Sequence, residues 1–165
     1  MAEAKRFELG DLRLQSGMTL KSAQITYQTY GTLSPGRDNA ILYPTSYGAH
    51  HTDIEWLIGP QGILDPDRYF VIIPNMFTNG LSSSPSNTPF PYDEGRFPLV
   101  TLYDNVHAQA RLLENVFGID RLRLVYGWSM GAMQAFHWGA LFPDKVDNIL
   151  ALCGAARTAP HNQIF

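Results

Sequence analysis

The hydrophobic residues follow different spacings along the chain, and each spacing predicts a different kind of element. Residues 7–14 are strand-like, and residues 21–30 alternate between apolar and polar side chains, as strands do when one face is buried. Ser16-Gly17 lies between them and favours a tight turn. The beginning of the chain therefore predicts an antiparallel hairpin.

Two short apolar runs follow, and each stops at a proline. Residues 40–43 end before Pro44, and residues 69–73 end before Pro74. Continuous apolar runs of this length are typical of strands buried on both faces of a sheet. Residues 75–98 are dense in Gly, Ser, Asn and Pro, and an irregular stretch of that length inside a compact domain is usually functional or disordered. We interpret it as a candidate wall of a site.

The apolar spacing changes to three and four residues after Thr101. Thr101 and Asp104 form a capping-box pattern, which predicts that a helix begins there, and Gly118 is typical of a helix end. The apolar face of this helix consists of Leu102, Val106, Ala110, Leu113 and Phe117.

Apolar runs and helical segments alternate again toward the end of the sequence. We expect strands at residues 122–126 and 146–152, with a helix over 130–142 that Pro143 ends. Strands that alternate with helices imply a parallel sheet with helices on its faces, connected by right-handed crossovers. The predicted fold class is therefore α/β, with a mostly parallel sheet and an antiparallel N-terminal hairpin.

The segment Gly127-Trp128-Ser129-Met130-Gly131 has the pattern G-x-S-x-G and lies between a predicted strand and a predicted helix. A serine in this pattern occupies a sharp turn that exposes its hydroxyl, and the glycines remove side chains that would clash there. The free N–H groups at the start of the helix point toward the place where an oxyanion would develop. This context favours Ser129 as a nucleophile over an ordinary glycine-rich turn.

An oxyanion hole beside such a serine requires two backbone N–H groups. One belongs to the residue after the nucleophile, Met130, and the other to the loop after an earlier strand. Pro44-Thr45-Ser46-Tyr47-Gly48 follows a predicted strand, and by position Ser46 is the donor; a plain turn explains the spacing equally well. Tyr47 and Trp128 are candidates for the wall of an acyl pocket, with core packing as the alternative for Trp128.

Several other polar residues invite a chemical interpretation. His50 and His51 follow the 44–48 loop, which makes them candidates for a substitute base, although a role in the loop itself is the alternative. We expect no metal site, because His50, His51 and Asp53 are not joined by a second cluster that would complete a tetrahedral set. Cys153 lies in an apolar run and is predicted to be a small buried residue.

Composition excludes several classes of protein. The 165 residues are 45% hydrophobic and 16% charged, which is typical of one globular domain. The net charge of −3 and the absence of a basic run argue against nucleic-acid and membrane partners. No segment approaches the roughly 20 apolar residues that span a bilayer, and the polar amino terminus lacks a signal-peptide pattern. With a single cysteine, the chain is expected in the cytoplasm.

Besides the G-x-S-x-G motif, longer segments spread over most of the chain match the pattern of a known family. In their order and spacing, they resemble the amino-terminal half of the homoserine O-acetyltransferase family, whose members have the α/β-hydrolase fold. The segments that carry the resemblance are residues 27–33, 45–51, 57–60, 65–72, 79–86, 97–101 and 128–135.

The resemblance implies a reaction and its site residues. Ser129 would be acylated by acetyl-CoA or by an ester, with the N–H groups of Met130 and Ser46 as the oxyanion hole and without a bound cofactor. The acyl group would then pass to a small-molecule hydroxyl acceptor or to water. The family's acetyltransferases typically carry Gly where this chain has Trp128, and Gly-Gly where it has Gly131-Ala132, which favours an ester hydrolase of the same family as the alternative.

The resemblance also implies where the rest of the catalytic machinery lies. The acid and the histidine of the family follow the nucleophile, beyond residue 165. Residues 1–165 would then be the amino-terminal part of a single α/β-hydrolase domain, with the strand at 146–152 lacking its neighbours. We therefore expect a homodimer or a complementary C-terminal chain, and an inactive half-domain that acts in assembly is the second alternative.

Overall fold

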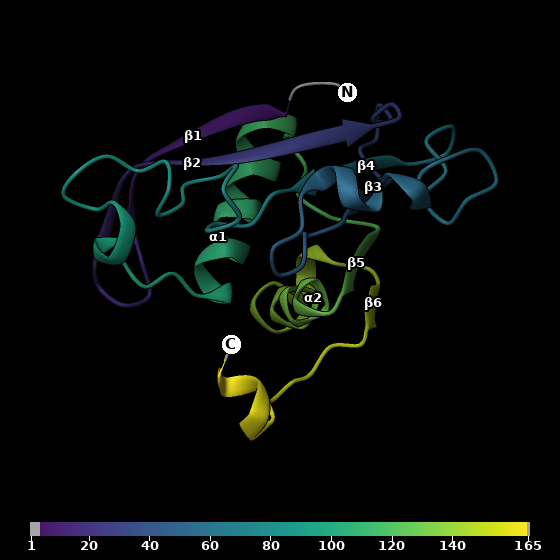
Figure 1. Ribbon diagram of the computed structural model, residues 1–165. Coiled ribbons are helices and arrows are strands. Elements are labelled where there is room, and N and C mark those ends of the chain that lie inside the picture. Colours follow the sequence, from purple (N-terminus) through teal and green to yellow (C-terminus); the bar gives the residue numbers. More distant parts are fainter. Residues whose placement is uncertain (1–3, 165) are drawn as a thin grey trace.

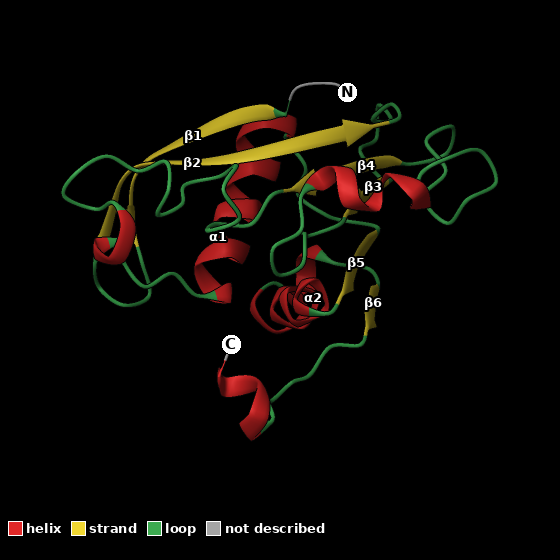
Figure 2. Cartoon of the chain, in the orientation of Figure 1, coloured by secondary structure: helices red, strands yellow, loops and turns green. Residues whose placement is uncertain are grey.

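The computed structural model describes residues 4–164, which form one six-stranded sheet, two α-helices and several shorter helices (Figures 1 and 2). The strands are β1 (Lys5–Arg13), β2 (Thr19–Tyr30), β3 (Ala40–Leu42), β4 (Phe70–Pro74), β5 (Leu124–Trp128) and β6 (Ile149–Leu152). The α-helices are α1 (Leu102–Leu112) and α2 (Met130–Leu141). Short 3-10 helices span His51–Leu57, Glu94–Arg96, Pro143–Lys145 and Pro160–Ile164.

The sheet is mixed, with strand order β1-β2-β4-β3-β5-β6. β1 pairs antiparallel with β2, and β2 pairs antiparallel with β4, whereas β4, β3, β5 and β6 run parallel to one another. The predicted hairpin is confirmed, and Gly17 supplies the turn with a φ of 85°. The predicted fold class is therefore confirmed.

The two apolar runs are central strands that are buried on both faces, as their composition predicts. Leu42 and Ile72 belong to the larger core, whereas Ile41 and Val71 belong to a smaller cluster. β4 extends one residue further than expected, because Pro74 pairs with β2 as its last residue. A proline is tolerated at that end, where the ladder needs no further N–H.

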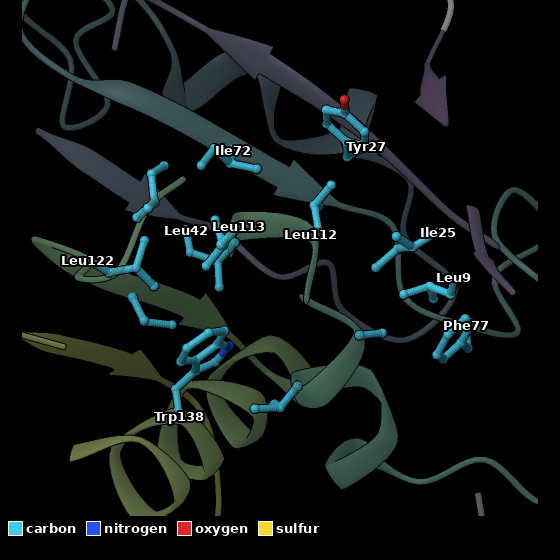
Figure 3. Close-up of a cluster of buried hydrophobic side chains, with 14 of the residues drawn as sticks. Leu9, Ile25, Tyr27, Leu42, Ile72, Phe77, Leu112, Leu113, Leu122 and Trp138 are labelled. Atoms are coloured by element: carbon cyan, nitrogen blue, oxygen red, sulfur yellow. The ribbon is translucent and has the colours of Figure 1, made fainter. Parts of the chain in front are cut away.

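Both α-helices lie on the same face of the sheet, and this corrects the expectation of helices on both faces. Val106 and Leu112 of α1 join Trp138 of α2 in the larger core. Figure 3 shows Leu112 and Trp138 together with strand residues such as Leu42 and Ile72. The other face is covered by the 3-10 helix His51–Leu57 and the loop after it, through Ile54 and Leu64. This β3–β4 connection buries Ile54 and Leu64 without forming an α-helix, while its Trp56 and Ile63 are exposed.

Helix α1 begins as the capping box predicts. The Thr101 side chain accepts a hydrogen bond from the N–H of Asp104, and Asp104 accepts one from the N–H of Thr101. Asp104 also accepts the N–H of Gln15 at 2.7 Å, which joins the helix to the β1–β2 turn. The helix continues into a π-helical turn over Leu113–Phe117 and ends at Gly118, whose φ is 60°.

The last strand differs from its prediction. β6 begins only at Ile149, and Val146 makes an isolated bridge to Leu122. Cys153 is exposed with a φ of 56°, so the prediction of a buried cysteine is wrong. Ile149 and Leu152 are 40% and 42% exposed. The expected homodimer or complementary chain stays a prediction.

In the described part of the chain, no helix combines the length and the apolar character needed to cross a membrane.

Candidate active site

Ser129 occupies the turn between β5 and α2, as the sequence pattern predicts. Its backbone has φ 55° and ψ −122°, a combination that is costly for a residue with a side chain. The N–H of Ser129 donates to the carbonyl oxygen of Leu152 at 2.9 Å, and its own carbonyl accepts the N–H of Ala132 at 3.0 Å. The side chain is exposed. The strained turn is thus held by β6 on one side and α2 on the other.

The glycines of the motif allow this turn to be tight. A Cβ atom on Gly127 would lie 2.1 Å from the carbonyl oxygen of Gly131. A Cβ atom on Gly131 would lie 2.6 Å from the carbonyl oxygen of Pro44. Both contacts are with backbone atoms, which cannot move aside easily. The glycines therefore permit the close approach of β5, α2 and the loop after β3.

The loop over residues 44–48 lies beside the serine because β3 and β5 are parallel neighbours. The carboxyl ends of neighbouring parallel strands meet at one edge of the sheet, where ligands bind in open α/β folds. The hydroxyl of Ser46 donates to the carbonyl oxygen of Trp128, directly before Ser129. The hydroxyl oxygen of Thr45 accepts the N–H of Met76 at 3.0 Å. The loop is thus tied both to the turn of the motif and to the end of β4.

Two backbone N–H groups remain free beside the nucleophile candidate. Met130 is the first residue of α2, and the N–H groups of a first helical turn have no partner within the helix. Within residues 4–164, neither Met130 nor Ser46 donates its backbone N–H to another residue. An exposed serine hydroxyl, a free N–H on the residue after it and a second free N–H on the neighbouring 44–48 loop are the groups that binding the oxyanion of a tetrahedral intermediate requires.

Trp128 and Tyr47 flank this arrangement at the surface. Trp128 is 53% exposed and Tyr47 is 68% exposed, so the alternative in which Trp128 packs in the core is wrong. Their role as an acyl-pocket wall stays a prediction. A cavity of about 260 Å³ lies elsewhere, at the opposite end of the sheet, and is lined by Arg37, Asp38, Arg123 and their neighbours.

The rings of His50 and His51 are directed into other contacts. His50 Nε2 lies 2.9 Å from the carbonyl oxygen of Asn79, and His51 Nδ1 lies 3.1 Å from the side-chain nitrogen of Asn75. In the described structure, no hydrogen bond joins either ring to Ser129. The structure thus gives both histidines a role in holding loops together, while the role of substitute base stays a prediction.

The irregular stretch after β4 is ordered by side chain–backbone hydrogen bonds. The Ser82 hydroxyl accepts the N–H of Thr26 and donates to the carbonyl oxygen of Asn75, at 2.9 and 2.7 Å. Asn79 donates to the carbonyl oxygen of Ala49 at 3.0 Å. The stretch therefore packs against β2 and against the segment that follows the 44–48 loop.

Sequence reasoning missed a buried polar network beneath the same loop. Gln134 of α2 donates to the carbonyl oxygen of Thr45 at 2.9 Å and accepts from Gln109 of α1 at 2.6 Å. Gln109 in turn accepts the indole N–H of Trp138 at 2.9 Å. Gln109 and Gln134 are both fully buried. The available signal was a glutamine at the spacing of Gly131, Ala135 and Trp138 on the inward face of a helix.

Burial keeps the tyrosine before the 44–48 loop neutral up to high pH. Tyr43 directly precedes the loop, is 1% exposed, and packs edge-on against Tyr126 with 4.9 Å between ring centroids. Burial raises the pKa of Tyr43 to about 12.

Nowhere in residues 4–164 do three His, Cys, Asp or Glu side chains form a group that could hold a metal ion.

The sequence is similar to a protein-family model and to esterases and homoserine O-acetyltransferases. A family model described as the alpha/beta hydrolase fold matches residues 48–164. A probable esterase of Corynebacterium glutamicum is 43% identical over 159 residues, which cover 95% of this chain and 46% of the relative. A homoserine O-acetyltransferase of Geobacter sulfurreducens is 38% identical over 167 residues, which cover 91% of this chain and 45% of the relative.

A solved structure agrees closely with the fold. The crystal structure of an acetylester hydrolase from Corynebacterium glutamicum matches with a TM-score of 0.95 and 40% identity, over 98% of this chain and 47% of that one. The chain thus spans about half the length of the curated relatives it matches. The resemblance to homoserine O-acetyltransferases is confirmed, and esterases are among the relatives as well.

Proposed function

This chain belongs to the alpha/beta hydrolase fold family, and on that premise we propose that it carries the nucleophile and the oxyanion hole of an enzyme that hydrolyses small carboxylic esters. The observation that carries the proposal is the strained, exposed Ser129 beside the free N–H groups of Met130 and Ser46. Acetyl esters are the proposed substrate class, because the similar solved structure is an acetylester hydrolase.

The proposed reaction proceeds through an acyl-enzyme. The Ser129 oxygen attacks the ester carbonyl carbon while its proton passes to a base, and the carbonyl oxygen becomes an oxyanion bound by the N–H groups of Met130 and Ser46. Collapse expels the alcohol, which takes the proton from the base. Water then attacks the acyl-Ser129 carbonyl by the same route and releases the carboxylic acid.

The base is proposed to come from outside the described residues. By the resemblance to homoserine O-acetyltransferases, the histidine and its acid are proposed to follow the nucleophile, beyond residue 165. The remainder of a longer polypeptide or a complementary chain would supply them. His50 and His51 are the candidates within the chain, and moving either ring to Ser129 would break its present hydrogen bond to Asn79 or Asn75.

Acyl transfer from acetyl-CoA to a hydroxyl acceptor is the second candidate function. The homoserine O-acetyltransferase relative at 38% identity supports it. The esterase relative at 43% identity and the half-exposed Trp128 beside the nucleophile support hydrolysis. The two reactions share the acyl-enzyme and differ only in the acceptor, water or a second substrate.

The decisive experiment is intact-mass analysis after treatment with a fluorophosphonate. Together with the remainder of the polypeptide or the complementary chain that supplies the base, the wild-type protein should gain one phosphonyl group at a rate far above that of free serine, and Ser129→Ala should gain none. An unlabelled wild type in the presence of the part that supplies the base would contradict the proposal, whereas residues 1–165 that stay unlabelled only when that part is missing would be the inactive half-domain. In a second assay, an activated acetyl ester is compared with acetyl-CoA plus homoserine, and CoA release that depends on homoserine would establish the transferase.

A further inference from the structure

Three buried side chains connect the core to the loop that carries Ser46. The indole N–H of Trp138 donates to Gln109, Gln109 donates to Gln134, and Gln134 donates to the Thr45 carbonyl oxygen, at 2.9, 2.6 and 2.9 Å. The relative exposure of these three side chains is at most 1%. Buried glutamines are uncommon in a core, and here each of the two is satisfied by hydrogen bonds on both sides of its amide group.

The ends of this chain of hydrogen bonds fix its direction. An indole N–H can only donate, and a backbone carbonyl oxygen can only accept. Gln109 must therefore present its oxygen to Trp138 and its nitrogen to Gln134, and Gln134 must present its nitrogen to Thr45. Rotating either amide by half a turn would place two donors or two acceptors face to face. The network has one satisfied arrangement.

The hydrogen bond from Gln134 to the Thr45 carbonyl oxygen determines where the N–H of Ser46 points. The carbonyl of Thr45 and the N–H of Ser46 belong to one peptide group, which is trans, so the two bonds point in opposite directions. Gln134 holds the carbonyl toward α2 and the core. The N–H of Ser46 is therefore directed away from the core. A carbonyl that accepts a hydrogen bond also polarises its peptide group, which strengthens the N–H on the other side as a donor.

We propose that Gln109 and Gln134 are positioning residues that aim and polarise the Ser46 N–H for oxyanion binding, with Trp138 setting the direction of the network. This inference rests on the proposed function of Ser129. Two buried glutamines would then stabilise the tetrahedral intermediate through the Thr45–Ser46 peptide group.

Two variants test the network. Gln134→Met retains the length of the side chain but removes the donor to Thr45, and Trp138→Phe removes only the N–H that fixes the direction. Loss of an oxyanion-hole donor lowers turnover about 100- to 1,000-fold, and we expect Gln134→Met to lower kcat for an activated acetyl ester by about 10- to 100-fold. KM should stay within about twofold, because the ground-state ester does not yet carry the negative charge. Trp138→Phe should show a smaller decrease in kcat.

A readout in the unreacted protein separates positioning from general destabilisation. The amide proton resonance of Ser46, measured by NMR, should shift in Gln134→Met because its peptide group loses polarisation. The matched control is Asp104→Ala, which removes buried hydrogen bonds from the other end of α1. It should lower the melting temperature while leaving both kcat and the Ser46 resonance unchanged.

The outcomes distinguish this inference from the proposed function. A reactive wild type whose kcat is unchanged in Gln134→Met would overturn the inference and leave the proposed function intact. A wild type that fluorophosphonate does not label even with the part that supplies the base would contradict the proposed function, and an unmoved Ser46 resonance would then overturn the inference as well. Should Gln134→Met not fold, Trp138→Phe decides by the same two measurements.

Discussion

The hydroxyl of Ser46 donates a hydrogen bond to the carbonyl oxygen of Trp128, which joins the loop after β3 to the residue that precedes Ser129. The two residues are 82 positions apart in the sequence. The bond leaves the backbone N–H of Ser46 free while fixing the distance between its loop and the turn of the motif. A proposed oxyanion-hole donor is thus positioned by its own side chain.

Replacing Ser46 by alanine removes this hydroxyl but keeps the backbone N–H that is the proposed oxyanion-hole donor. It should therefore slow the reaction only partly. We expect Ser46→Ala to lower the rate of fluorophosphonate labelling by about tenfold, less than the roughly 100-fold that follows loss of a donor. Ser46→Thr, which retains the hydroxyl, should restore most of the rate. As a control, Ser34→Ala removes a hydroxyl bonded to Asp38 in a distant turn and should leave labelling unchanged. Equal rates for wild type and Ser46→Ala would count against this prediction.

The strained backbone of Ser129 should be measurable as lost stability. A residue with a side chain at φ 55° and ψ −122° pays a conformational penalty that glycine avoids. Ser129→Gly should raise the free energy of unfolding by about 1 kcal/mol relative to Ser129→Ala, as the usual range for such strain suggests. Urea unfolding of the two variants checks this, and equal midpoints would refute it. Both variants should lose fluorophosphonate labelling.

The close approach at Gly127 should make that position intolerant of any side chain. A Cβ atom there would lie 2.1 Å from the backbone oxygen of Gly131, so the turn must distort to admit it. We expect Gly127→Ala to lower the free energy of unfolding by about 3 kcal/mol, the upper part of the range for overpacking. Gly95→Ala is the matched control, because no atom lies within 4 Å of the added Cβ. A similar loss in both variants would show that the clash is not the cause.

Asn75 should be among the polar residues on which stability depends most. It is fully buried, its oxygen accepts the N–H of His51, and its nitrogen donates to the Thr26 hydroxyl. Asn75→Ala leaves the N–H of His51 buried without its acceptor, which costs about 1–3 kcal/mol. It also leaves the Thr26 hydroxyl with Ser82 as its remaining side-chain partner. Thermal unfolding should show a much larger decrease than for Asn87→Ala, because Asn87 is an exposed residue and water can replace the hydrogen bonds of its side chain to residues 80–84. Comparable melting temperatures for the two variants would contradict this role.

Tyr43 should make the protein sensitive to high pH. Burial raises its pKa to about 12, while an unfolded tyrosine titrates near pH 10. Between these values the unfolded state releases a proton that the folded state retains, so stability is intact below about pH 10 and falls as pH rises toward 12. One such group contributes a slope of about 1.4 kcal/mol per pH unit. Urea unfolding from pH 9 to 11.5 should show a weaker dependence in Tyr43→Phe, and identical curves would refute the assignment.

Local sequence patterns determined the secondary structure and the strand–serine–helix turn. The hairpin, the capping box of α1 and the G-x-S-x-G motif depend on backbone conformations and side-chain spacings within a few residues, which the sequence displays directly. The sequence predicted the ends of strands less accurately, because they depend on pairing with a neighbouring strand. β6 begins where it pairs with β5, and β4 ends where it pairs with β2. Pairing is a property of two segments, and one segment's pattern does not contain it.

The tertiary structure alone decided which distant groups meet. The sequence identified Ser129, but the bond from Gln134 to Thr45 spans 89 positions, and the contacts of His51 with Asn75 depend on how two loops cross. The exposure of Cys153 and the placement of both α-helices on one face were decided in the same way. Backbone conformation is set largely by near neighbours, whereas burial and side-chain partners depend on the packing of the whole sheet, which no local pattern specifies.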